Sequence, residues 1–213
     1  LVIEELDRVV SQTAEERAKA QGLLERVASS LRLAQERWEG LKVRGATEPA
    51  LGRSLSELRA HAGQLTGVVV KRTVAAYHQI NVGMEAFIAE FESLMGEMDA
   101  LQDLMERSRE AIEGDVGTLA QVQGMCQQLV GEDPLLELDL SSALIEKATE
   151  IYKKAELQRD LGTREGYEKV IGLSEMALQR LSEAQEATSD LSEEVQAVRE
   201  SLTAQWNEGQ NLW

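Results

Sequence analysis

Apolar residues recur at alternating intervals of three and four along most of this chain. Between residues 1 and 44 they form one seam, in which Arg17 is the single misfit. A repeat that averages 3.5 residues places its members on one face of an α-helix and is typical of coiled-coil-like packing. The seam residues here are Leu6, Val10, Ala20, Leu24, Val27, Leu31, Ala34, Trp38 and Leu41. The pattern predicts a long amphipathic helix whose seam must be covered by other helices.

The same spacing continues over residues 51–112, with two places where consecutive steps are four residues. Such stutters locally relax a left-handed supercoil. This segment is therefore expected to be a second, longer helix, and the sequence leaves open whether that helix is continuous. Three of its residues, Gly63, Gly67 and Gly83, each cost about 1 kcal/mol in a helix interior. We therefore expect a kink near 61–67 or 81–83.

Glycine, proline and threonine predict the helix limits. Residues 44–46 should end the first helix, and Thr47 with Pro49 should start the second. Residues 113–117, which contain two glycines, should end it. We expect a short helix over 118–130, a fourth helix over 140–161 and a last helix capped by Gly162 and Thr163. Residues 188–190 could interrupt the last helix.

These elements predict an all-α fold, an elongated antiparallel bundle of about five helices with coiled-coil-like heptad seams. Short loops require neighbouring helices to be antiparallel. Aromatic residues make up only 4% of the chain, whereas leucine, alanine and glutamate abound, which favours helices over sheets. Residues 1–213 would form a single elongated bundle, or two sub-bundles, 1–113 and 114–213, that share the long second helix.

The strongly acidic composition limits the classes of partner. The formal net charge is −16, from 38 acidic and 22 basic residues. Such a chain repels phosphates and anionic lipids unless its cations cluster, and they do not. No run of 18 apolar residues is present. We therefore expect no nucleic-acid partner and no direct membrane insertion of this segment.

Residues suited to catalysis are scarce. The only histidines are His61 and His78, and the only cysteine is Cys126. The motifs of zinc proteases, nucleophilic serine hydrolases, phosphate-binding loops and EF-hands are absent. His61 is expected to pair with Glu57 one turn away, and His78 to be partly buried. We expect no catalytic residue, no cofactor and no metal ligand, and hence no enzyme.

Five residues are candidates for a ligand or interface role. Arg72, His78 and Asn81 lie in a polar zone of the second segment and either fix helix register or line a small-molecule pocket where Arg72 binds an anion. Met95 lies off the seam in a methionine-rich stretch that serves as core filling or as an adaptable partner groove. Trp213 is expected to plug the bundle end or to mark an interface.

Two short stretches resemble known repeat helices. Residues 37–41, Arg-Trp-Glu-Gly-Leu, look like the end of a spectrin-repeat helix, but no second copy follows at that family's period. Residues 151–178 are similar to a tetratricopeptide helix pair, but they occur once and their turn is too long. Neither resemblance assigns a family or a function.

The sequence favours a non-catalytic helical scaffold or protein-interaction module, which binds a protein partner or self-associates. Sustained heptads, an acidic surface and the lack of a catalytic motif support this expectation. The alternative is a ligand-sensing extracytoplasmic helical-bundle domain of a bacterial membrane receptor. It is suggested by the apolar residues 1–3, which do not include methionine, and by Leu212 and Trp213 at the other end.

Overall fold

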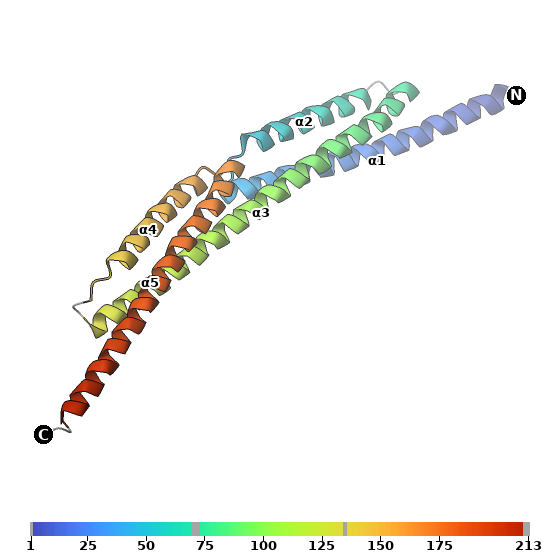
Figure 1. Ribbon diagram of the computed structural model, residues 1–213. Coiled ribbons are helices and arrows are strands. Elements are labelled where there is room, and N and C mark those ends of the chain that lie inside the picture. Colours follow the sequence, from blue (N-terminus) through green and yellow to red (C-terminus); the bar gives the residue numbers. More distant parts are fainter. Residues whose placement is uncertain (1, 70–72, 134–135, 211–213) are drawn as a thin grey trace. The chain divides into compact units, whose positions relative to one another are not determined.

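The computed structural model describes residues 2–69, 73–133 and 136–210. In these ranges the chain forms five α-helices and no β-strand (Figure 1). The helices are α1 (Val2–Val43), α2 (Pro49–Val69), α3 (Val74–Glu132), α4 (Asp139–Arg159) and α5 (Arg164–Gln210). The prediction of an all-α bundle of about five helices is confirmed. Its elongated outline and its coiled-coil geometry stay predictions.

Two turns end and start helices as the sequence predicts. Gly45, after the last turn of α1, has a φ of 102°, and the next amide donates a 3.0 Å hydrogen bond to the Leu41 carbonyl. Gly162 has a φ of 66°, and Thr163 Oγ1 accepts a 3.1 Å hydrogen bond from the amide of Gly166. Positive φ favours glycine because it has no Cβ, and threonine satisfies a free amide in the first turn.

The sequence left open whether the helix over 51–112 is continuous, and the chain forms two helices there. α2 ends at Val69, and α3 begins at Val74. Thr73 precedes α3, and its Oγ1 accepts a 3.2 Å hydrogen bond from the amide of Ala76. This is the bond of an N-cap residue to the third helical position. Thr73 lies within the segment 51–112 whose spacing predicted a helical seam, and its hydroxyl instead starts a new helix.

The helix end expected at 113–117 is wrong, because α3 continues to Glu132. The expected short helix over 118–130 is the last part of α3. Ile112 and Val122 on either side of the two glycines are buried, at 5% and 0% exposure. Burial of a helix face stabilises more than the roughly 1 kcal/mol that each glycine costs, so tertiary packing overrides the local signal.

The chain divides into two compact units, unit 1 (residues 1–103) and unit 2 (residues 104–213). In unit 1, α1 runs parallel to the first part of α3, since Glu16 contacts Asn81 and Arg37 contacts Asp99. α2 runs antiparallel to both. Gly83 makes this packing close, because a Cβ there would lie 2.5 Å from Leu65 Cδ2 on α2.

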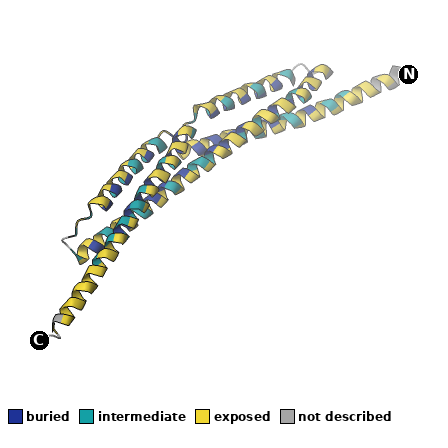
Figure 2. Cartoon of the chain, viewed as in Figure 1, coloured by how far each residue is buried: buried dark blue, intermediate teal, exposed yellow. Residues whose placement is uncertain are grey.

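The unit 1 core lies along the predicted seams, which repeat as buried positions in Figure 2. On α1 the buried members are Ala20, Val27, Ala34, Trp38 and Leu41. The seam is not covered throughout, because Val10 is 64% exposed. α2 and α3 contribute Leu51, Leu55, Leu58, Ala62, Leu65, Ala76, Tyr77, Ile80, Met84, Phe87, Leu94, Met98 and Leu101. Each helix thus buries one stripe against the other two.

Unit 2 repeats this arrangement with the second part of α3, α4 and α5. α3 and α5 are parallel, since Glu132 contacts Arg199 and Cys126 contacts Thr188. α4 is antiparallel to them, since Ser141 near its start contacts Thr188. One core cluster contains Val122, Leu144, Ala148, Leu181 and Ala184, and another Ile112, Ala155 and Val170. α5 is continuous, so residues 188–190 do not interrupt it.

Candidate interaction grooves

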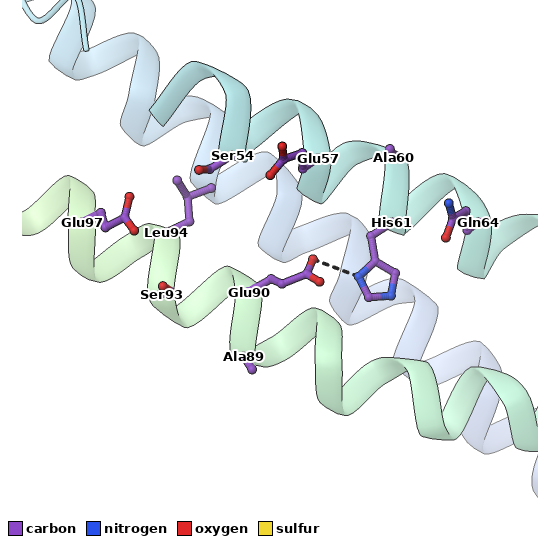
Figure 3. Close-up of a pocket in the computed structure, with 10 residues that line it drawn as sticks. All are labelled: Ser54, Glu57, Ala60, His61, Gln64, Ala89, Glu90, Ser93, Leu94 and Glu97. Carbon is purple, nitrogen blue, oxygen red and sulfur yellow. Dashed lines mark hydrogen bonds and ion pairs between the residues drawn. The ribbon is translucent and has the colours of Figure 1, made fainter. Parts of the chain in front are cut away.

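An open groove lies between α2 and α3 in unit 1, with a volume of about 730 Å³ (Figure 3). It is lined by Ser54, Glu57, Ala60, His61 and Gln64 of α2 and by Ala89, Glu90, Ser93, Leu94 and Glu97 of α3. Most of these side chains are small or polar. The lining includes three glutamates and no lysine or arginine, so the groove favours cationic groups.

His61 joins the two sides of this groove. Its Nδ1 lies 2.9 Å from Oε2 of Glu90, the contact drawn as a dashed line in Figure 3. The partner is thus Glu90 on α3, whereas Glu57 on the same helix was expected. The His61 ring also meets the edge of Phe87, with the ring centroids 5.9 Å apart. The histidine therefore has a structural role in holding α2 against α3.

Unit 2 has a corresponding groove between α4 and α5, with a volume of about 660 Å³. Its apolar lining residues are Leu138, Leu140, Leu144, Ala187 and Leu191, and Ser141 is also present. Its acidic lining residues are Glu137, Glu183, Glu186, Asp190 and Glu194. Leu140 is 65% exposed, so part of the apolar surface is open to solvent. This groove combines an apolar surface with a rim of negative charge.

One rim carboxylate already has a cationic neighbour. Arg180 Nη1 lies 2.7 Å from Oε2 of Glu183, and this hydrogen bond lowers the pKa of Glu183 below its usual value. Lys147 adds a weaker electrostatic contribution in the same direction. The lining itself contains no basic residue, so the groove surface keeps its acidic character.

Three of the predicted site residues, His78, Asn81 and Met95, are not among the residues that line these grooves. His78 is exposed, which corrects the expectation of partial burial. Asn81 is half-buried, and its Nδ2 donates a 2.7 Å hydrogen bond to Oε2 of Glu16 on α1. Met95 is half-buried on α3. Arg72 and Trp213 lie outside the described residues, so the suggested anion pocket stays a prediction.

One buried acidic residue of unit 2, Asp115, was not predicted from the sequence. Asp115 on α3 is 2% exposed, and Ser174 on α5, equally buried, lies beside it. Burial raises the pKa of Asp115, and the nearby Ser174 hydroxyl partly opposes that change. Neither side chain completes a hydrogen bond of standard geometry with another described residue. The missed signal was the seam itself, since Asp115 lies three residues after Ile112 and seven before Val122.

Comparisons with known proteins assign no relative. No family model matches the chain, and no curated protein or solved structure matches it significantly. Among the described residues, no group of three His, Cys, Asp or Glu side chains could hold a metal ion. Nor does any helix within the described ranges combine the length and apolar character that a membrane crossing requires.

Proposed function

We propose that this chain is a non-catalytic protein-interaction module whose α4/α5 groove binds a basic amphipathic helix of a partner protein. The observation that supports the proposal is the combination of open apolar side chains with an acidic rim. Leu140 is 65% exposed within the groove, and five carboxylates surround the apolar residues. An amphipathic helix laid in a groove is a recurring mode of peptide recognition.

The two components of the groove would contribute differently. Burying Leu138, Leu140 and Leu191 under the apolar face of a partner removes hydrocarbon from water, which supplies most of the affinity. The carboxylates would pair with lysine or arginine on the flanks of the partner helix. Charge complementarity of this kind raises the association rate and selects partners more than it raises affinity. The overall charge of −16 acts in the same direction on any cationic partner.

The apolar part is tested with a peptide of about 18 residues, five helical turns, that carries leucine on one face and lysine on the other. Leu140→Ala should weaken binding about five- to tenfold, because truncating an interface anchor costs more than 1 kcal/mol. Leu157→Ala is the matched control. It lies on the same helix with 66% exposure and does not line the groove. Equal losses for the two variants would overturn the proposed site.

The acidic rim is tested by neutralising two of its carboxylates, and the control neutralises two carboxylates of the unit 1 groove. Glu186→Gln with Glu194→Gln should slow association of the peptide several-fold and flatten its dependence on salt. The control, Glu57→Gln with Glu97→Gln, removes the same charge from the unit 1 groove. If both pairs act alike, the peptide responds only to net charge. That result would contradict a specific site in the α4/α5 groove.

A further inference from the structure

The apolar seam of α5 extends beyond the core that it helps to form. Members from Val170 to Thr188 are buried against α3 and α4. The same alternation of three and four residues then continues without a break. The full seam is Val170, Ser174, Ala177, Leu181, Ala184, Thr188, Leu191, Val195, Val198 and Leu202, followed by Trp206. The last part of α5 is thus built like the part that packs in unit 2.

This last part lies past the helices that cover the rest of the seam. α3 ends at Glu132, which contacts Arg199 through its carbonyl and its carboxylate. Val198 is 58% exposed, Leu202 60% and Trp206 69%, and Figure 2 shows the end of α5 exposed. An isolated helix of about 12 residues is marginal in water. The exposed part of the seam therefore has the properties of a helix-packing surface without a partner helix among the described residues.

We propose that residues 195–210 of α5 pair with the same residues of a second copy of this chain, as a parallel two-stranded coiled coil. The exposed residues continue the buried seam of α5, and this continuity supports their packing against another helix. The seam has Val195 and Leu202 at one core position of the heptad and Val198 and Gln205 at the other. The core residues of the proposed pair lie outside the α4/α5 groove lining, and only the flanking Glu194 belongs to both surfaces, so either proposal can fail without the other.

The charge pattern favours a second copy in parallel orientation. Residues 195–210 hold Arg199, Glu200 and Glu208, a net charge of −1 in a chain of −16, so repulsion between copies is low here. Glu194 and Arg199 occupy the two positions that flank the seam, five residues apart. In a parallel pair these flanking positions of the two chains form interhelical salt bridges. Arg199 has donors to spare beside its contact with Glu132, because a guanidinium carries five N–H groups.

Sedimentation equilibrium of the whole chain tests the self-association. The mass should rise from monomer towards dimer between low and high micromolar concentration. Val198→Ala with Leu202→Ala should weaken this association at least tenfold and keep the helix. The control, Val43→Ala with Leu33→Ala, changes the same residue types at exposed positions of α1. A mass that does not depend on concentration, or equal effects of the two pairs, would overturn the proposal.

The orientation has its own test, in a Cys126→Ser background that leaves no native thiol. Gln205→Cys places a thiol in the seam and should form a disulfide-linked dimer under mild oxidation. Asn207→Cys, two residues on and about 200° around the helix, should not. A parallel pair in register brings position 205 against itself, whereas an antiparallel pair of residues 195–210 would centre near residue 202 and separate the two thiols. Failure of Gln205→Cys to cross-link, while the mass still depends on Val198 and Leu202, would overturn the parallel arrangement.

Discussion

The Asn81 amide on α3 donates a 2.7 Å hydrogen bond to Glu16 on α1, while its Oδ1 is buried without a partner among the described residues. The two residues are 65 positions apart, and their contact together with that of Arg37 and Asp99 shows that α1 is parallel to this part of α3. Only one of the two polar atoms of the Asn81 amide therefore has a hydrogen-bond partner among the described residues. Because an unpaired buried amide costs more than a made hydrogen bond gains, this pair fixes the register of unit 1 rather than adding much stability.

Removing Glu16 should leave the whole Asn81 amide without a partner. We expect Glu16→Ala to lower the free energy of unfolding by about 1–2 kcal/mol, measured by urea denaturation. Glu15→Ala, at an exposed position next to it, should change the value by less than about 0.5 kcal/mol. In a double-mutant cycle, Asn81→Ala should remove most of the cost of Glu16→Ala. Additive effects would show that the pair does not couple.

The N-cap of α3 gives a second prediction. Thr73→Ala removes the acceptor for the Ala76 amide and should destabilise unit 1 by about 1 kcal/mol, whereas Thr73→Ser should keep the stability. Thr66→Ala is the control, because the Thr66 hydroxyl bonds the Ala62 carbonyl within its own helix. Urea denaturation followed by circular dichroism reports the differences. Equal effects of Thr73→Ala and Thr66→Ala would contradict the capping role.

The helical class was predictable because the heptad pattern is long and strong, but two of its boundaries were not. A threonine without an adjacent glycine or proline starts α3, and local signals gave no reason to prefer Thr73 over a seam position. Conversely, Gly114 and Gly117 suggested a helix end where α3 continues. There the seam through Ile112 and Val122 was the better guide, because burial outweighs propensity.

The grooves were less predictable than the fold. They depend on which helices become neighbours, and the seam does not specify partners. Once α4 and α5 are antiparallel, Leu140 and Glu194 come to line one surface although 54 residues separate them. His61 could not be assigned to Glu90 before the break at Thr73 was known, because that break turns α3 back along α2.

Asp115 predicts a dependence of stability on pH. Because burial raises its pKa, the folded chain keeps the proton at pH values where the unfolded chain, with a pKa near 3.8, has lost it. The contribution of Asp115 to stability is therefore favourable at low pH. It falls as the pH rises from 3.8 through the raised pKa of the folded state. Above that interval the buried carboxylate destabilises unit 2.

Asp115→Asn should therefore raise the free energy of unfolding near neutral pH by about 1 kcal/mol. The advantage should shrink as the pH is lowered towards 3.8, since the wild-type side chain is then neutral as well. Denaturation curves of both proteins across this range measure the difference. Asp190→Asn, at an exposed position of α5, should change stability by less than about 0.5 kcal/mol. A difference for Asp115→Asn that grows on acidification would contradict the assignment.

Two glycines of α5 should respond to alanine with opposite signs. Gly166 is buried in the first turn, and a Cβ there would lie 2.6 Å from the Gln158 carbonyl oxygen of α4. Gly166→Ala must push the α4–α5 turn apart and should cost about 1–3 kcal/mol. A Cβ at Gly172 meets nothing within 4 Å, so Gly172→Ala should gain about 1 kcal/mol of helix propensity. Both lie in unit 2, so one urea experiment compares them. Stabilisation by both substitutions would show that the turn is looser than the structure has it.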